Sequence, residues 1–241
     1  MIKGINLGSG NNWHAPGWIG LDLINGCNLS KDTKLSFGDN ILDFSFSCHF
    51  LEHINDEDSL GLIREIYRVL KPKATFRIIV PNYEIFINKY LENDEQWYSD
   101  KGPGETRFKE WKNYNVDKSL MNRMLHHVSN FDFNGDKGFY RGPPIGSYTE
   151  EEVIDNAKKM SVGDFHSWMQ SFIDYKDPRV VSQHINWWTK DKLISFLKEA
   201  GFSTCYQTDY NQSKCTEFLK PQFDSWKPQR RNNSLFIEAI K

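Results

Sequence analysis

Residues 5–22, INLGSGNNWHAPGWIGLD, decide the fold of this 241-residue chain. A strand-like run is followed by the glycine turn Gly8-Ser9-Gly10, a second strand-like run and Asp22. A turn without bulky side chains lets a ligand lie against the backbone, and a carboxylate after the next strand can accept hydrogen bonds from both hydroxyls of a ribose. This order predicts a nucleoside-binding site. Taken singly, the glycine pair is also typical of a tight turn, and Asp22 of a solvated carboxylate.

Strand-like runs recur along the chain and alternate with turns or helical patterns, as expected when parallel strands alternate with crossovers. The predicted strands are 2–7, 17–22, 42–48, 75–80, 203–208 and 234–240. Apolar residues at helical spacing predict a helix over 56–71, which Asn55 caps and Lys71-Pro72 ends, and a second over 189–200. The pattern predicts an α/β fold.

Between the two halves of this pattern, residues 93–183 form a predicted insertion. It holds scattered aromatic residues and two short helical stretches, at 149–160 and 164–175, and it is too long for a plain loop. We therefore expect a core over 1–92 and 184–241 with an inserted cap. The aromatic residues of the cap fit either a small satellite core or a lid that excludes water from a reaction.

Composition limits the possible partners. The chain has 30 Lys and Arg against 32 Asp and Glu, a net charge of −2, which predicts no general attraction to nucleic acid or to an anionic membrane. No run is long enough to span a membrane, and four cysteines without CxxC spacing favour free thiols in a reducing cytoplasm. We expect a cytoplasmic protein whose partner is a small molecule; the sequence leaves its oligomeric state open.

Three further motifs stand in register with the opening one. They are LSFGDNILD at 35–43, CHFLEHI at 48–54 and REIYRVLKP at 64–72. With the opening, these motifs resemble the class I S-adenosylmethionine (SAM) dependent methyltransferases, in particular the small-molecule branch that is called methyltransferase-11-like. The resemblance covers residues 2–82 and extends over 184–241, without the cap. It implies a Rossmann-like, seven-stranded, mostly parallel sheet with an inserted helical cap, and SAM as cofactor.

The resemblance also implies which residues bind the cofactor. These are Gly8, Ser9, Gly10, Asp22, Asp32, Thr33, Cys48 and His49. The glycine turn would approach the methionine part, Asp22 would bind the ribose diol, and Asp32 with the Thr33 backbone would receive the adenine amino group. Asp32 is open to a second interpretation as part of a surface turn. Cys48 and His49 would close the pocket.

The sequence departs from the family pattern in two places. The crossover over 8–16 is shorter than a parallel connection with a helix requires, so we expect the usual first helix to be truncated or missing. Lys73-Ala74 replaces the Gly-Gly that usually follows Lys-Pro, so that turn lacks a residue suited to positive φ.

His49, Glu52 and His53 form an HxxEH motif, in which the three side chains share one face if the segment is helical. Some methyltransferases carry ExxEH here and hold a divalent metal with it. The present motif has one carboxylate fewer, which suits magnesium poorly and a softer ion better. The favoured interpretation is that Glu52 and His53 brace the strand end by hydrogen bonds; a metal is possible but not favoured.

The remaining candidates concern catalysis and the acceptor. His49 and His127 are the predicted catalytic residues, since either imidazole could remove a proton from a hydroxyl acceptor. Arg141 and Arg230 are predicted to bind an anionic acceptor, with a solvated basic loop as the alternative. His166, which stands beside Phe165, is predicted to be a packing residue.

We therefore predict a SAM-dependent methyltransferase that acts on a small molecule. The resemblance suggests a hydroxyl of a sugar, or of a phosphorylated or nucleotide-linked precursor, in surface-polysaccharide biosynthesis. The alternatives are a non-catalytic SAM-binding module and a nicotinamide-dependent oxidoreductase. The sequence lacks the dinucleotide-binding fingerprint that the second would require. The third glycine of that fingerprint would fall on Trp13, and its acidic residue would stand well beyond Asp22.

Overall fold

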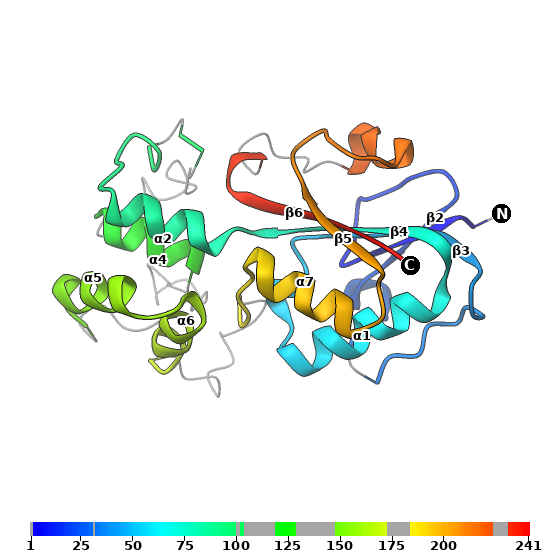
Figure 1. The fold of residues 1–241 in the computed structure, drawn as a ribbon, viewed down its shortest axis with the longest axis horizontal. Coiled ribbons are helices and arrows are strands. Elements are labelled where there is room, and N and C mark those ends of the chain that lie inside the picture. The colour runs from blue at the N-terminus through cyan, green and yellow to red at the C-terminus, as the bar shows by residue number, and fades with distance from the viewer. Residues whose placement is uncertain are drawn as a thin grey trace. The chain divides into compact units, whose positions relative to one another are not determined.

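The computed structural model describes residues 2–30, 32–99, 102–103, 119–128, 148–172, 184–223 and 231–241. The chain divides into two compact units. The first comprises Met1–Val80 and Lys190–Lys241, and the second comprises Pro81–Thr189. The first unit contains a β-sheet with helices, and the described part of the second is helical (Figure 1).

The sheet of the first unit has six strands within the described residues. They are β1 (Gly4–Leu7), β2 (Trp18–Leu21), β3 (Leu42–Cys48), β4 (Leu70–Pro81), β5 (Thr204–Thr208) and β6 (Ser234–Ile240). Their order is β2-β1-β3-β4-β6-β5, and the pairs β1–β2, β1–β3 and β3–β4 are parallel. The predicted Rossmann-like α/β class is confirmed; the described residues contain six strands where the resemblance implied seven. Between β2 and β3 the described residues form turns and the 3-10 helix η1 (Leu23–Asn25), because the segment that follows is rich in turn-forming residues.

The last two strands run in opposite directions. β5 pairs with β6 antiparallel, and at the start of β4 the N–H of Lys73 donates to the carbonyl of Lys241. The N–H of Lys241 in turn donates to the carbonyl of Ala74, so β6 ends where β4 begins. Lys73 takes a left-handed conformation, φ 69°. The expected turn is thus made by a lysine that adopts the conformation for which glycine is better suited.

One face of the sheet carries the two predicted helices, which we call the helical face (Figure 1). Helix α1 (Asp56–Val69) begins as predicted, because the Asn55 side chain accepts from the N–H of Asp58. It ends at Val69 and not at residue 71, since Leu70 is already the first residue of β4. Helix α7 (Lys190–Glu199) lies beside it. Rings join the layers: Phe202 contacts Tyr67 of α1 and Phe76 of β4.

The opposite face is covered by rings from loops, and we call it the aromatic face. Its members are Trp13, Trp18, Phe44, Phe46, Phe218 and Phe223. As expected, residues 8–17 between β1 and β2 contain no helix. Trp18 packs 4.5 Å from Phe223, centroid to centroid, and its indole N–H donates to Glu217 at 3.0 Å. Phe218 and Phe223 come from the short 3-10 helices η4 (Thr216–Leu219) and η5 (Pro221–Phe223), drawn in orange in Figure 1.

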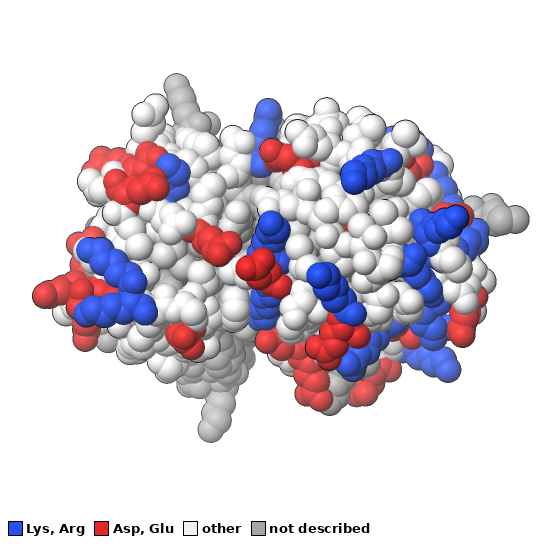
Figure 2. All heavy atoms as spheres, in the orientation of Figure 1, with Lys and Arg blue, Asp and Glu red and all other residues white. Residues whose placement is uncertain are grey.

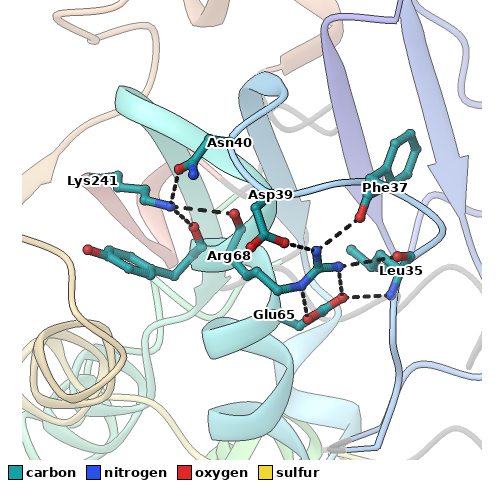
Figure 3. A network of polar contacts seen from close by, with 8 residues as sticks. Leu35, Phe37, Asp39, Asn40, Glu65, Arg68 and Lys241 are labelled. Carbon is teal, nitrogen blue, oxygen red and sulfur yellow. Dashed lines mark hydrogen bonds and ion pairs between the residues drawn. The ribbon is translucent and has the colours of Figure 1, made fainter.

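A polar network fixes the segment that leads into β3 (Figure 3). The Arg68 guanidinium donates to the Phe37 carbonyl at 3.0 Å, to Asp39 at 2.6 Å and to Glu65. Glu65 also accepts from the N–H of Leu35 at 2.7 Å. Hydrogen bonds from Arg68 hold the pKa of Glu65 below its ordinary value although burial opposes them, so the network keeps its charges at neutral pH.

The second unit contains four helices among its described residues. They are α2 (Tyr83–Leu91), α4 (Leu120–Val128), α5 (Glu150–Lys159) and α6 (Val162–Gln170). They share an apolar core that includes Phe86, Tyr98 and Leu125. The helix predicted at 149–160 is confirmed as α5, whose capping box is formed by Thr149 and Glu152. Helix α6 begins earlier than the predicted residue 164, because Ser161 provides its N-cap. Residues 173–175 of that prediction lie outside the described residues.

Charges of both signs are interspersed on the face of the molecule shown in Figure 2. This distribution agrees with the net charge of −2. A search of the described residues finds no helix that combines the length and the apolar character needed to cross a bilayer.

Candidate functional site

The glycine turn follows β1 at the edge of the sheet where the parallel strands end. Gly8 and Gly10 both have positive φ, 65° and 66°. The N–H of Gly8 donates to the carbonyl of Leu21, which ties the turn to the end of β2. A Cβ on Gly8 would lie 2.5 Å from the Phe50 side chain, whereas one on Gly10 would meet nothing within 4 Å. Gly8 is therefore needed for packing, and Gly10 leaves space beside the backbone where a ligand can approach.

Asp22 is held by the backbone on both sides. One carboxylate oxygen accepts from the N–H of Gly10 at 2.8 Å, and the other accepts from the N–H of Ile24 at 3.1 Å. Asp22 is thereby the N-cap of η1 and a link to the glycine turn. Each carboxylate oxygen keeps further acceptor capacity, so a fixed carboxylate of this kind suits a vicinal diol.

Two residues next to Asp22 were not predicted from the sequence. Leu23 and Ile24 are large apolar side chains that are 72% and 63% exposed. Together they offer an apolar surface directly beside the Asp22 carboxylate. The signal that could have found them is their position, since an apolar pair has no reason to follow an acidic residue into a surface turn.

Asp32 and Thr33 lie in a turn after this segment. The Thr33 hydroxyl accepts from the N–H of Ser30 at 2.7 Å and donates to the carbonyl of Asn28 at 2.8 Å. The N–H of Thr33 donates to the carbonyl of Ser30. Because the hydroxyl of Thr33 closes its own turn, Asp32 is the exposed residue of the pair that could receive a ligand group.

Cys48 and His49 stand at the end of β3, beside the turn that follows β1. The two strands are paired in register, with Leu7 opposite Ser47. His49 has φ 52°, an uncommon conformation for a residue that is not glycine, and its N–H donates to the carbonyl of Ile79 at 2.8 Å. Such conformations are often found at functional sites. Phe50, the next residue, packs on Gly8, so His49 is adjacent in the chain to the residue that touches the glycine turn.

Both ring nitrogens of His49 have partners within the first unit. Nδ1 lies 3.2 Å from the Glu52 carboxylate, and Nε2 lies 2.9 Å from the Ser234 hydroxyl. The side chains of His49 and Glu52 are 11% and 1% exposed. Glu52 thus contacts the first histidine of the HxxEH motif. Ser234 was missed, and its separation of 185 positions from His49 left no local signal.

His127 and His166 both contact aromatic side chains of the second unit. The His127 ring stacks on Phe86, 4.1 Å between centroids, and the His127 carbonyl lies 3.3 Å from Nδ1 of His184. His166 is 3% exposed, contacts Tyr83 edge-on and is hydrogen-bonded to Gln170, as a packing residue would be.

The predicted anion-binding residues Arg141 and Arg230 lie outside the described residues. The neighbouring Arg231 is described, and its guanidinium lies 4.9 Å from the centroid of the Tyr210 ring.

The edge of the sheet fits SAM on structural grounds. Gly10 leaves an open position, Asp22 presents a fixed carboxylate, and Leu23 adds an exposed apolar side chain. SAM carries a diol, an adenine ring and a sulfonium without a phosphate, so a carboxylate and an apolar surface suit it better than a phosphate-binding helix end.

A comparison with protein families gives a match inside the sheet. Residues 25–78 match a family model described as "Methyltransferase domain", a segment of less than a quarter of the chain. It begins after Asp22 and runs through β3 and α1 into β4. None of the curated proteins that were compared matches the chain.

Three solved structures illustrate the structural neighbours. A SAM dependent methyltransferase from Archaeoglobus fulgidus has 13% identity and a TM-score of 0.42, with 100% of this chain and 86% of the other covered. One from Mesorhizobium loti has 15% identity and a TM-score of 0.41, with 100% and 91% covered. One from Aquifex aeolicus has 18% identity and a TM-score of 0.27, and the alignment covers 34% of this chain and 57% of the other. Likenesses at this level say nothing about a substrate.

The sheet defines an α/β protein whose glycine turn is joined to the carboxylate of Asp22. The family match within that sheet, together with the motifs at 35–43, 48–54 and 64–72, supports a SAM-dependent methyltransferase of class I. A match to a methyltransferase domain indicates S-adenosylmethionine as the cofactor.

Proposed function

We propose that the protein methylates a hydroxyl group of a small molecule. The observation that carries this proposal is the position of His49, a nearly buried imidazole at the end of β3. The next residue in the chain, Phe50, packs against Gly8 of the glycine turn. A hydroxyl must lose a proton when it is methylated, and a histidine is the side chain best suited to accept one near neutral pH. An amine acceptor would make less use of such a base.

In this proposal the cofactor lies along the edge formed by the ends of β1, β2 and β3. Asp22 binds the ribose diol, Gly8-Ser9-Gly10 approaches the methionine part, and Asp32 with Thr33 receives the adenine, while Cys48 closes the pocket. When bound, the cofactor supplies an electrophilic methyl group. The protein aligns the acceptor oxygen, excludes water and takes up the proton.

We further propose the class of acceptor: a sugar, or a phosphorylated or nucleotide-linked precursor, in the assembly of a surface polysaccharide. The local basic residues around Arg141 and Arg230 support an anionic acceptor. The four free cysteines support a cytoplasmic location for the reaction. His127 is the second candidate for the proton acceptor.

The test is a panel of hydroxyl compounds in matched phosphorylated and dephosphorylated forms, assayed with methyl-labelled SAM. We expect transfer to a phosphorylated member, with a Michaelis constant that rises in Arg141→Ala and Arg230→Ala. Equal rates on both members of every active pair would contradict the anionic site. Binding of SAM without transfer to any member would favour a non-catalytic SAM-binding module.

Removal of the base gives a second measurement. His49→Ala should lower turnover by ~10²–10⁴ and leave the dissociation constant of SAM within a few-fold, because a proton acceptor contributes to rate and little to cofactor binding. We expect a drop of the same kind in His127→Ala. Activity that is lost in chelator and returns with manganese, iron or zinc would instead make the HxxEH side chains metal ligands, and the metal-free proposal would be wrong.

A further inference from the structure

A hydroxyl, an imidazole and a carboxylate follow one another in the first unit. The Ser234 hydroxyl lies 2.9 Å from Nε2 of His49, and Nδ1 of the same ring lies 3.2 Å from the Glu52 carboxylate. Beyond Ser234, its hydroxyl lies 3.4 Å from the side-chain oxygen of Asn233. The three groups come from the start of β6, the end of β3 and the 3-10 helix η2 (Leu51–His53), so the fold and not a local sequence motif brings them together.

This arrangement assigns protons to the ring. A carboxylate accepts only, so Glu52 selects the form of His49 that carries its hydrogen on Nδ1. Nε2 is then an acceptor that faces the Ser234 hydroxyl. If the ring gains a second proton, Nε2 becomes a donor to the Ser234 oxygen, and that hydroxyl can turn toward Asn233. Both protonation states therefore have a complete set of partners.

The position of Ser234 decides what His49 can do. Since the hydroxyl of Ser234 occupies Nε2 and Glu52 occupies Nδ1, a proton that arrives from an acceptor has its direct route to the ring through Ser234. β6 runs antiparallel to β4 and ends where β4 begins, which places the start of β6 at the edge where the parallel strands end. Ser234 is thus at the same edge as the glycine turn.

We propose that Ser234 passes the proton of the acceptor hydroxyl to His49 and that Glu52 is a positioning residue for the imidazole. The proposal rests on the proposed O-methylation. In the balanced step, the acceptor oxygen forms a bond to the methyl carbon and the carbon–sulfur bond breaks, with its electron pair left on sulfur. Ser234 takes the acceptor's proton as its own proton moves to Nε2. The positive charge that leaves sulfur ends on His49, next to the nearly buried carboxylate of Glu52.

The first experiment reads the ring directly. Histidine-labelled ¹⁵N NMR of the full chain should show His49 with its hydrogen on Nδ1 in the neutral state. Glu52→Gln should reduce this preference, and Ser234→Ala should keep it while it shifts the Nε2 resonance. Ser203→Ala is the matched control, because its hydroxyl donates to the carbonyl of Ile240 on the same hairpin and should leave the His49 signals unchanged.

The second experiment uses the active member of the hydroxyl panel. Ser234→Ala should lower kcat by about 10²-fold, with the acceptor KM and the dissociation constant of SAM within about three-fold of the wild type, because the relay acts only in the reaction step. Ser234→Thr keeps a hydroxyl and should retain most of the rate. Glu52→Gln should lower kcat with the same unchanged affinities.

Three results would overturn the proposal. The first is a wild-type protein that transfers methyl normally while the neutral His49 ring carries its hydrogen on Nε2. That result would contradict the relay but not the proposed O-methylation. The second is an unchanged kcat in Ser234→Ala. The third is covalent labelling of Ser234 by a fluorophosphonate, which would make it a nucleophile. By contrast, SAM binding without transfer to any panel member would overturn the proposed function itself.

Discussion

The two faces of the sheet are covered in different ways. On the helical face, α7 packs on β5 and β6, and α1 lies beside α7. On the aromatic face, rings from two loops pack on strand residues such as Phe46 without an α-helix among the described residues. That face also encloses a fully buried ion pair between Arg77 and Glu238, at 2.7 Å.

The difference shows that a layer of an α/β fold need not be a helix. The aromatic face is made of large rings in edge-to-face and tilted contacts, each of which buries more apolar surface than an aliphatic side chain. A small number of large aromatic residues can therefore cover a sheet face in place of a helix. The cost is that each ring carries a larger share of the stability of that face.

Truncation of one residue on each face tests this difference. Trp18→Ala should lower the free energy of unfolding by about 3–5 kcal/mol, because it leaves a cavity among rings and removes the donor to Glu217. Leu62→Ala on α1 should cost about 2–4 kcal/mol, since the neighbouring helix can relax partly into the space. Chemical denaturation measures both, and a smaller loss in Trp18→Ala than in Leu62→Ala would contradict the comparison.

The loop from β1 to β2 serves the aromatic face through Trp13 and the ligand edge through its glycine turn. Asp22→Ala should weaken SAM binding by about 2–4 kcal/mol, because two charge-assisted hydrogen bonds to the ribose diol are lost. Calorimetric titration of the folded variant measures this. Asp43→Ala, which removes a surface pair with Lys71, should bind SAM as the wild type does. Unchanged affinity in Asp22→Ala would contradict the assignment of the ribose site.

The two glycines of the turn separate packing from binding. Both have positive φ, but only Gly8 lies against Phe50. Gly8→Ala should lower the free energy of unfolding by about 2–3 kcal/mol, and Gly10→Ala by about 1 kcal/mol, from backbone strain alone. Gly10→Ala should nevertheless weaken SAM binding, since the added methyl group would occupy the space beside the backbone where the cofactor is proposed to approach. Equal losses of stability in the two variants would show that Phe50 does not constrain the turn.

Acid should weaken the aromatic face before the helical face. Burial alone would raise the pKa of Glu217, but hydrogen bonds from Lys220, Lys3 and Trp18 outweigh it and hold the pKa at about 2. A carboxyl with a lowered pKa stabilises the fold above its ordinary value of 4.5, and this contribution is lost as the pH falls from about 5 to 2. We expect a loss of about 2 kcal/mol over that range, which is smaller than the full shift because the lysines are partly exposed. Glu217→Gln should unfold with less dependence on pH there.

The sequence predicted the helical face better than the aromatic face. Helix α1 has an N-cap at Asn55 and apolar residues at helical spacing, so its start was predicted correctly. Phe218 and Phe223 have no periodic pattern around them and lie in short 3-10 helices. The local sequence therefore did not predict that they pack on the sheet. The six strands named from the sequence are those found among the described residues, whereas the seventh was implied only by the family resemblance and had no run of residues assigned to it.

The sequence grouped those candidate site residues that lie close together along the chain. The glycine turn and Asp22 are joined by a hydrogen bond over 12 positions, and the HxxEH contact spans three. Ser234 was missed because it reaches His49 only through the order of strands in the sheet. The role assigned to His127 stays a prediction, and its stacking on Phe86 is a contact that no sequence pattern indicated.

The hydrogen bond from Trp18 to Glu217 joins residues 199 positions apart. Contacts of this length close a large loop and form slowly, whereas α1 and the strands on either side of it are neighbours in sequence. The helical face can therefore assemble while residues 216–223 are still being synthesised. Until then Trp18 and Phe46 have no cover, and the growing chain exposes an aromatic surface that favours association with other unfinished chains.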